Sequence, residues 1–403
     1  MTHDAWNQGV GRKDRMKSVD RSVGVFFWRG MRASLTRPGQ AWQFARALRW
    51  QAAAARVRKG WRERGVCVPP IIIFSITHQC NLQCVGCYAR AFQGAGEASG
   101  GAGGVAAAPV ADAAAQPKEL SDAKLGSIVA EATELGVSFF VIAGGEPLMR
   151  KEILAIADRF PRVLFLVFTN GLLLDEEMVG RLARLKNVIP LLSLEGTATE
   201  TDERRGAGTH EQLIAAMARL QRQRHFFGCS LTLTSRNFST IFADGYIGRL
   251  AAAGCRFFLF ADYTPIDPGT EDWVLTAAQR EQVESLMQTL RKRHSALFVA
   301  VPWDEREVGG CLSAGRGFVH INAAGAVEPC PFAPFSDADL TRVSLVEALQ
   351  SPFLAKLRTL PELLEYEGGG CELWKNREQV EQALAEVQAR HASSRPEVHA
   401  HRS

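Results

Sequence analysis

Six short apolar runs, rich in β-branched residues, alternate with longer helical patterns between residues 71 and 262. Such alternation is typical of consecutive βα units around a parallel sheet. Six units predict an α/β fold in the form of an open or partial (βα)6 barrel of the TIM type. The predicted strands are residues 71–76, 138–142, 163–168, 188–194, 229–234 and 256–262. The predicted helices lie near residues 122–135, 151–160, 175–185, 210–224 and 239–253.

Barrels of this kind place the active site on the loops that follow the strands. The first predicted strand is followed by Cys80, Cys84 and Cys87. Three thiolates at these spacings can hold one metal centre from a single loop. One interpretation is a zinc site with His78 as the fourth ligand, although structural zinc sites usually combine a short cysteine pair with a distant pair. Three cysteines without a nearby fourth instead suit a cubic iron–sulfur cluster with one iron open to a small molecule.

This cysteine loop resembles that of the radical S-adenosylmethionine (radical SAM) superfamily, whose pattern is Cys-x-x-x-Cys-x-x-Cys. The resemblance implies that the three thiolates hold a 4Fe-4S cluster and that the fourth iron chelates SAM. One electron from the reduced cluster would then cleave SAM to a 5′-deoxyadenosyl radical, which abstracts hydrogen from an unreactive carbon. The barrel would position the substrate and keep water away.

Further segments after the second, third and fourth strands resemble the family in the same order. Ala143 to Pro147 is similar to its Gly-Gly-Glu-Pro segment, which holds the methionine amino group. Glycines there let the backbone approach a ligand, and a carboxylate pairs with an ammonium group. In the segment after the fourth strand, Glu195 replaces the Asp that is more usual in the family. An arginine farther along the chain is expected to bind the cofactor carboxylate, and the sequence does not decide between Arg205 and Arg204. The cofactor-binding residues that the resemblance implies are Tyr88, Gly144, Gly145, Glu146, Pro147, Asn170, Ser193, Glu195 and Arg205.

Three later cysteines, Cys311, Cys330 and Cys371, follow the predicted barrel, and Gly325 between the first two marks a hairpin turn. This region resembles the auxiliary-cluster extension of the SPASM or twitch type. Full SPASM regions have more cysteines, so at most one auxiliary 4Fe-4S cluster is expected. Its fourth ligand would be absent, supplied from elsewhere or not a cysteine. The alternative is three buried thiols, since free cysteine often behaves as a small core residue.

The remaining cysteines, Cys67, Cys229 and Cys255, lack ligand-like spacing and are predicted to be buried thiols. Nine cysteines in a long chain without an export signal do not suggest a disulfide framework. Tyr263 follows the sixth strand and is a candidate radical quencher or hydrogen-bond donor facing the substrate, with a packing role as the alternative.

Residues 1–68 hold 15 Lys or Arg against four acids, a formal charge of +11, and five of the eight tryptophans. Amphipathic rings beside cations suit an anionic membrane surface, whereas the alternative is a helical extension packed on the main body. The predicted organisation then continues with a radical SAM core at 69–270 that contains a flexible Gly/Ala insertion at 91–116. A helical connector at 271–310, a small α+β auxiliary-cluster domain at 311–385 and a disordered tail at 386–403 complete the chain.

The formal charge of the whole chain is only +4, which does not favour a nucleic-acid partner. No apolar run is long enough to span a membrane, and the first residues do not resemble a signal peptide, so the expected location is the cytoplasm, with peripheral contact at the inner membrane surface as an option. The predicted function is C–H oxidation or cross-linking of a peptide, with a flavodoxin or ferredoxin type electron donor. The alternatives are modification of a lipid or lipid-linked molecule and a zinc-binding module without catalysis.

Overall fold

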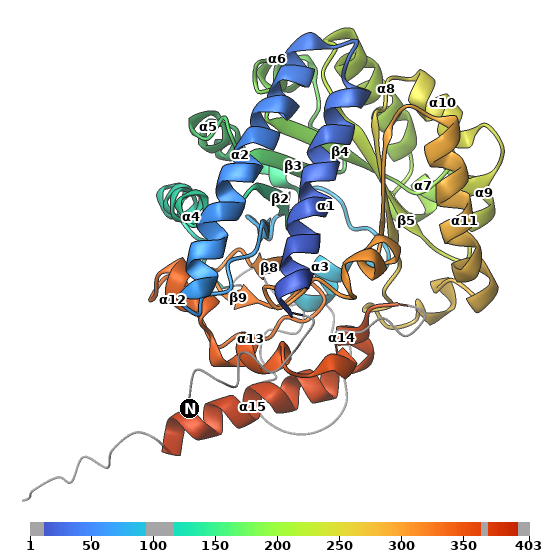
Figure 1. The fold of residues 1–403 in the computed structure, drawn as a ribbon. Coiled ribbons are helices and arrows are strands. Elements are labelled where there is room, and N and C mark those ends of the chain that lie inside the picture. Colours follow the sequence, from blue (N-terminus) through green and yellow to red (C-terminus); the bar gives the residue numbers. More distant parts are fainter. Residues whose placement is uncertain (1–11, 94–116, 364–369, 394–403) are drawn as a thin grey trace, which may run out of the picture.

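The computed structural model describes residues 12–93, 117–363 and 370–393 (Figure 1). Its strands form one sheet in the order β7-β6-β5-β4-β3-β2-β1-β8-β9, and helices cover the outside of the sheet. From β1 through β7 every strand is parallel to its neighbour. The α/β class and the partial barrel are therefore confirmed.

Each of the six predicted strands is present to within one residue at either end. They are β1 (Ile71–Ser75), β2 (Phe139–Ala143), β3 (Leu164–Thr169), β4 (Val188–Leu194), β5 (Gly228–Leu233) and β6 (Phe257–Asp262). Outward-facing residues such as Ile72, Phe74 and Phe140 are buried beneath the surrounding helices. The strands are buried on both faces, which explains their nearly continuous apolar sequences.

Four predicted helices correspond to α4 (Asp122–Glu134), α5 (Glu152–Arg159), α6 (Glu176–Arg184) and α8 (Thr209–Arg222). The single helix predicted at 239–253 is divided into α9 (Phe238–Phe242) and α10 (Tyr246–Ala252), because Gly245 between them has a φ of +82°. The helix α7 (Ala198–Arg205) was not predicted; a capping box between Thr197 and Glu200 starts it. Two short elements, α3 (Tyr88–Gln93) and the 3-10 turn Pro147–Met149, follow β1 and β2.

The sheet continues past residue 270, where the sequence analysis ended the core. After the 3-10 turn Glu271–Trp273 and helix α11 (Ala277–Arg293), β7 (Leu297–Val301) pairs with β6. A 3-10 turn, Trp303–Val308, leads to β8 (Phe318–Ile321), which pairs in parallel with β1. The strand β9 (Val327–Glu328) closes an antiparallel hairpin at Gly325, whose φ is +104°. The C-terminal extension thus completes the edge of the barrel sheet beside β1.

The chain after the β8–β9 hairpin is mainly helical, with α12 (Leu345–Leu349), α13 (Pro352–Leu357), the 3-10 turn Pro361–Leu363, α14 (Glu372–Lys375) and α15 (Arg377–Ser393). Helix α15 runs through residues 386–393, which had been assigned to a disordered tail. Val380, Ala383 and Val387 are buried on one stripe of this helix, and that contact stabilises it. Residues 94–116, most of the predicted flexible insertion, lie outside the described residues, as do 394–403.

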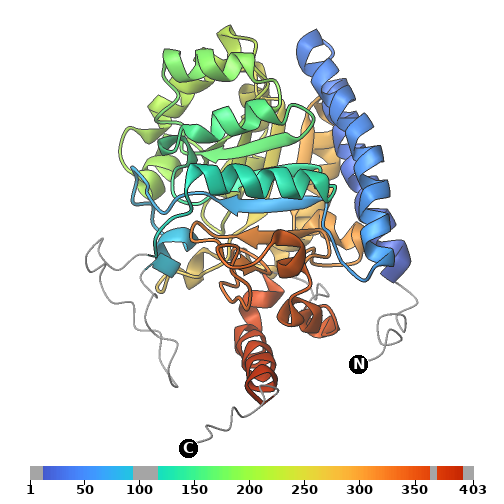
Figure 2. The same ribbon diagram turned by 90° about the vertical axis from the view of Figure 1, so that its left-hand side faces the viewer.

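Two antiparallel helices, α1 (Arg12–Ala33) and α2 (Pro38–Glu63), close the amino-terminal end of the barrel. Val23, Phe27 and Phe44 of this hairpin pack against the first residues of the strands, among them Phe139 and Phe257. Figure 2 shows the hairpin at one end of the strands and the loop between β1 and α3 at the other. No helix among the described residues is long and apolar enough to span a membrane.

His225, just before β5, is expected to make the fold sensitive to acid. Its side chain is fully buried, Nε2 donates to the Val188 carbonyl at 3.0 Å, and burial lowers its pKa to about 3. Below pH ~6.5 this histidine binds a proton in the unfolded chain but stays neutral in the folded chain. The free energy of unfolding therefore falls by about 1.4 kcal/mol per pH unit as the pH is lowered to ~3. The variant His225→Gln should lose this decline. Urea unfolding of both proteins between neutral pH and mild acid measures it, and parallel curves would contradict the prediction.

Candidate active site

Cys80, Cys84 and Cys87 lie on the loop between β1 and α3, at the carboxyl end of the strands. Burial raises the pKa of the Cys80 and Cys84 thiols, and each of them also interacts electrostatically with the Cys87 thiol. Three thiols on one loop that influence each other's ionisation are of the donor type that an iron–sulfur cluster uses. Cysteine binds metal as the thiolate, and partial burial makes these thiols harder to ionise. The positive charge of bound iron would have to compensate for that cost.

The Gly-Gly-Glu-Pro loop packs directly on this cysteine loop. The amides of Gly145 and Glu146 donate to the carbonyls of Thr77 and Gln79, both at 2.8 Å. A Cβ atom at Gly144 or Gly145 would overlap these same backbone atoms, and Gly144 has a φ of +122°. The two glycines are therefore required for the contact between the loops.

Glu146 is buried, and both of its carboxylate oxygens accept hydrogen bonds from the chain. The donors are the Leu148 amide (3.0 Å), the Thr169 hydroxyl (2.8 Å) and the Asn170 amide (2.7 Å). Burial raises the pKa of Glu146 in spite of these donors. The Asn170 side chain donates to Asn81 of the cysteine loop at 2.7 Å. Glu146 thus joins the ends of β2 and β3, and its carboxylate is engaged before any ligand binds.

Glu195, at the end of β4, pairs with both arginines that the sequence could not separate. Arg204 Nη1 lies 2.7 Å from one carboxylate oxygen, and Arg205 Nε lies 2.9 Å from the other. Burial acts to lower the pKa of Arg205, but Glu195 and the Cys84 thiol outweigh it and raise that pKa. Ser193 lies two residues before Glu195 on β4 and is paired with Ser230 of β5.

Arg204 and Arg205 differ in what else they contact. Arg204 Nε donates to the Val85 carbonyl at 3.2 Å, and the Val85 amide donates back to the Arg204 carbonyl at 2.9 Å. Arg204 is therefore bound to the backbone of the cysteine loop, whereas Arg205 lies near the Cys84 and Cys87 thiols. Both guanidinium groups act to lower the pKa of the Cys84 thiol, so which of the two meets a ligand stays a prediction.

Tyr263 packs behind the cysteine loop. Its hydroxyl donates to Thr270 Oγ1 at 2.7 Å, and its ring lies under the Arg204 guanidinium and beside Trp273. The side chain is buried, and its hydroxyl occupies the space that a Cβ atom at Gly86 would need. These contacts correspond to the packing alternative for Tyr263, and its role in catalysis stays a prediction.

The variant Gly86→Ala should lose most of its cluster iron. Gly86 has a φ of +67°, and its new methyl group would collide with the Tyr263 hydroxyl, so the loop between Cys84 and Cys87 must shift. Removing that hydroxyl in Gly86→Ala/Tyr263→Phe should restore most of the iron, leaving a backbone cost of about 1 kcal/mol. Iron per chain after anaerobic reconstitution measures both effects. Full iron in the single variant would contradict the prediction.

Cys311, Cys330 and Cys371 converge from three separate segments, although 60 residues of sequence separate the first from the last. A hydrogen bond between the two thiols raises the pKa of Cys330 and lowers that of Cys371, and burial raises the pKa of Cys311 to about 12. The Glu305 carboxylate lies close enough to affect the pKa of both Cys311 and Cys371. The other three cysteines are buried as predicted, with Cys229 and Cys255 sulfurs 3.6 Å apart.

Tyr88, one of the predicted cofactor-binding residues, lies edge-on to Phe332, two residues after Cys330, with ring centroids 5.2 Å apart. Its role at the cofactor stays a prediction. A polar network that the sequence analysis missed lies at the end of β1 and on β8 and β9. At the end of β1, Ser75 Oγ lies 2.8 Å from His320 Nε2, and His320 Nδ1 lies 2.6 Å from a Glu328 oxygen. No spacing in the sequence signals this network, because it depends on the pairing of β8 with β1.

Within the described part of the chain, no three Cys, His, Asp or Glu side chains are arranged to hold a single metal ion. A mononuclear zinc site would need such a convergence. A cubic cluster spreads its ligands more widely, and each group of three thiols supplies the donor type that it requires. The assignment of the six cysteines to two iron–sulfur clusters stays a prediction.

Comparison with known proteins agrees with this geometry. Residues 74–234 match the family model described as "Radical SAM superfamily". This segment is a radical SAM domain. It is 26% identical to the AdoMet-dependent heme synthase of Methanosarcina barkeri over 76% of this chain and 89% of that protein. It is also 26% identical to the mycofactocin maturase MftC of Mycobacterium tuberculosis, over 67% of this chain and 66% of that one.

Among solved structures, this radical SAM chain is similar to Streptococcus suis SuiB bound to its precursor peptide SuiA. The TM-score is 0.56 at 16% identity, covering 78% of this chain and 71% of SuiB, so the likeness concerns the fold. The chain is a radical SAM enzyme with a C-terminal extension of the auxiliary-cluster type. Its cofactors are those of the superfamily, a 4Fe-4S cluster and SAM.

Proposed function

We propose that this radical SAM enzyme modifies a C–H position of a peptide, by oxidation or by cross-linking. Relatives named for peptide maturation support the substrate class: the chain is similar to mycofactocin maturase MftC and, at 26% identity, to the PqqA peptide cyclase of Granulibacter bethesdensis. The single observation that carries the chemistry is the convergence of the β1 to β4 loops on Cys80, Cys84 and Cys87.

In this proposal Cys80, Cys84 and Cys87 hold the cluster that binds SAM and, when reduced, generates the 5′-deoxyadenosyl radical. Gly144 and Gly145 lack side chains, and their backbone lies against the cysteine loop. We propose that the same backbone approaches the cofactor bound at that loop. The residues proposed to shape the rest of the cofactor site are Tyr88, Glu146, Pro147, Asn170, Ser193, Glu195 and Arg205.

Glu146 and Glu195 act mainly on neighbouring groups in this proposal. Glu146 fixes the Asn170 backbone, and Glu195 neutralises and orients Arg205. A guanidinium held in this way presents its remaining N–H groups in a fixed direction, which suits a forked pair of hydrogen bonds to a carboxylate. We propose the carboxylate of SAM as that partner.

Cys311, Cys330 and Cys371 are proposed as ligands of one auxiliary cluster. Glu305 supplies the carboxylate nearest to them and is the candidate for the fourth, non-cysteine ligand. Tyr88, which directly follows Cys87, contacts Phe332, two residues after Cys330, so we propose that the two clusters lie in neighbouring parts of the fold.

A tetrapyrrole is the second candidate substrate. The heme synthase relative is matched over 89% of its length, a larger share than for the mycofactocin maturase. Shorter matches include an Fe-coproporphyrin III synthase and a pre-heme d1 synthase.

The comparisons do not favour the lipid-modifying or zinc-binding alternatives. We propose an electron donor of the flavodoxin or ferredoxin type. Peripheral contact of residues 1–68 with a membrane is proposed as a matter of location, independent of the substrate.

Anaerobic turnover separates the two substrates. The reconstituted enzyme is incubated with SAM and a reductant, and in parallel with a peptide encoded by a short neighbouring reading frame or with Fe-coproporphyrin III. We expect 5′-deoxyadenosine formation to rise with the peptide and the peptide mass to fall by whole hydrogens. Loss of carboxyl groups from the porphyrin with an unchanged peptide would overturn the peptide proposal.

A further inference from the structure

The outer face of the α1–α2 hairpin carries basic and apolar side chains together. On α1, positions 17, 21, 25, 28 and 32 follow one another at steps of four or three and form a single exposed stripe of Lys, Arg, Val, Trp and Arg, which Leu35 continues in the turn. On α2, Trp42, Arg49 and Arg56 are spaced by seven and are also exposed. We call this set the hairpin face.

The apolar members of the hairpin face are unusually accessible. Leu35 is 69% exposed, Trp42 is 60% exposed and Trp28 is 44% exposed, and most of the exposed large hydrophobic residues in the described chain belong to the hairpin. Guanidinium groups lie over both indole rings, Arg32 over Trp28 at 4.9 Å and Arg49 over Trp42 at 5.6 Å. The fold itself does not need these side chains, because the inner residues Val23, Phe27 and Phe44 already seal the barrel.

The charge on and around the hairpin face is predominantly positive. The exposed basic residues of the hairpin, with Arg29, Lys59 and Arg64 now included in the hairpin face, are Lys17, Arg21, Arg29, Arg32, Arg49, Arg56, Lys59 and Arg64. In residues 17–64 the acids are Asp20, which pairs with Arg58, and Glu63, which pairs with Lys59. A surface of this kind is complementary to an anionic partner.

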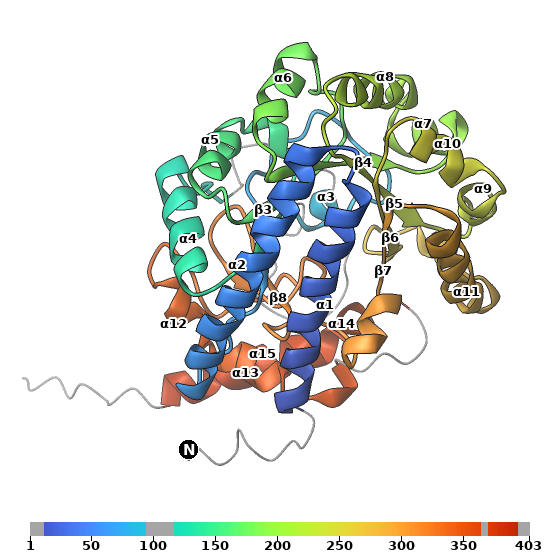
Figure 3. The same cartoon turned by 45° about the horizontal axis from the view of Figure 1, so that its top comes forward.

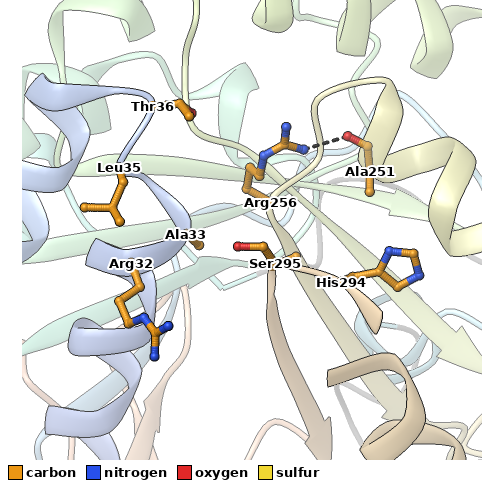
Figure 4. A pocket seen from close by; sticks show the side chains of 9 residues that line it. Arg32, Ala33, Leu35, Thr36, Ala251, Arg256, His294 and Ser295 are labelled. Carbon is orange, nitrogen blue, oxygen red and sulfur yellow. Dashed lines mark hydrogen bonds between the residues drawn. The ribbon is translucent and has the colours of Figure 1, made fainter. Parts of the chain in front are cut away.

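A basic cavity of about 470 Å³ opens where the hairpin turns. Arg32 and Leu35 of the hairpin line it together with Arg256, His294 and Ser295 from the amino ends of β6 and β7. Figure 4 shows Arg256 and Ser295 between the hairpin turn and His294, with Arg32 at the edge. Guanidinium, imidazole and hydroxyl groups around one cavity suit a phosphate ester.

We propose that the hairpin face docks peripherally on a bilayer containing anionic phospholipids, with one lipid headgroup in the cavity beside Arg32, Arg256 and His294. A bilayer fits better than an acidic protein, because the hairpin face extends along two helices that lie side by side, and tryptophan and arginine are the residues that suit a membrane interface (Figure 3). The hairpin closes the end of the barrel opposite the cysteine loop, so docking leaves the active-site mouth facing the solvent. This inference does not depend on the proposed substrate.

Deleting residues 1–68 would be a poor test, since it would expose the apolar lower end of the barrel. The test instead uses the full-length enzyme in co-sedimentation with vesicles of equal parts phosphatidylglycerol and phosphatidylcholine, compared with phosphatidylcholine alone. We expect binding to the anionic vesicles only. Raising the ionic strength from about 0.1 M to about 1 M, which shortens the Debye length from about 10 Å to about 3 Å, should abolish it.

Variants of exposed residues then locate the contact. Arg21→Gln/Arg29→Gln/Arg56→Gln should weaken binding on the order of a hundredfold, from about fivefold per cation. Trp28→Ser/Leu35→Ser/Trp42→Ser should weaken it about tenfold or more. The matched control Arg184→Gln/Ile214→Ser changes exposed residues on α6 and α8 and should bind as the wild type does. Unchanged SAM cleavage and melting temperature in all variants show that the fold is intact.

Three results would overturn the inference. Equal binding to neutral vesicles, or no binding, would remove the anionic bilayer as the partner. Wild-type affinity in either hairpin-face variant would place the contact elsewhere. Self-association that the same variants abolish, without vesicle binding, would assign the hairpin face to a second copy of the chain. A further pair of variants tests the cavity. Arg32→Gln/His294→Asn should weaken vesicle binding more than fivefold beyond the loss caused by Arg29→Gln alone, where about fivefold is the effect of one cation. An equal loss in the two variants would reject the headgroup site.

Discussion

The variant Cys84→Ala is expected to produce no 5′-deoxyadenosine from SAM under reducing, anaerobic conditions. Cys84 is the central thiol of the loop and interacts with both the Cys87 thiol and Arg205. Two remaining thiolates cannot keep a cubic cluster with one iron free for SAM, so the loss should exceed the detection range of the assay. Product is measured by chromatography after reconstitution, and production by the variant would refute the cluster assignment.

Cys67→Ser is the matched control for this variant. Cys67 is also a free, buried thiol, but it belongs to neither predicted ligand set, and its Sγ donates to the Gly315 carbonyl at 3.3 Å. A serine hydroxyl can make the same contact, so iron content and SAM cleavage should be retained. Paramagnetic resonance gives a second measurement: adding SAM should change the signal of the reduced wild-type and Cys67→Ser proteins and leave that of Cys84→Ala unchanged.

The second large effect is expected at Glu195, because one carboxylate neutralises two arginines. Glu195 is buried, and the side chains of Arg204 and Arg205 are only 11% and 12% exposed. In Glu195→Gln both guanidinium groups lose their charge partner in a poorly solvated place, which should lower the free energy of unfolding by about 3 kcal/mol or more. The apparent affinity for SAM should fall as well, since Arg205 loses its orientation.

The variant Glu195→Asp distinguishes the effect of the negative charge from the effect of side-chain length. It keeps the negative charge and supplies the residue more usual in the family, but its shorter side chain cannot contact both arginines at the distances that Glu195 allows. We expect a smaller loss of stability than in Glu195→Gln and a measurable loss of SAM affinity. Chemical denaturation and calorimetric SAM titration compare the three proteins, and equal stability of wild type and Glu195→Gln would show that the pair contributes nothing.

Local sequence signals predicted the barrel strands accurately, because each strand is a short apolar run between loops and is buried on both faces. The cysteine loop and the Gly-Gly-Glu-Pro segment were equally recognisable, since their chemistry depends on residue type and close spacing. Helix α7 was missed because Ala198–Arg205 is polar except for Ala198 and has no apolar stripe. Its signal was the capping box of Thr197 and Glu200, which the sequence analysis did not use.

The sequence by itself determined the fold class, the order of the loops and the thiols available to hold a cluster, because these depend on neighbours along the chain. Only the tertiary structure decided that β8 pairs with β1, that Glu195 bridges both Arg204 and Arg205, and that Tyr88 faces Phe332. The first and the last of these contacts join residues far apart in the chain, and the Glu195 pairs join the end of β4 to α7. They are selected by packing and by the need to pair buried charges, for which spacing along a single sequence contains no signal.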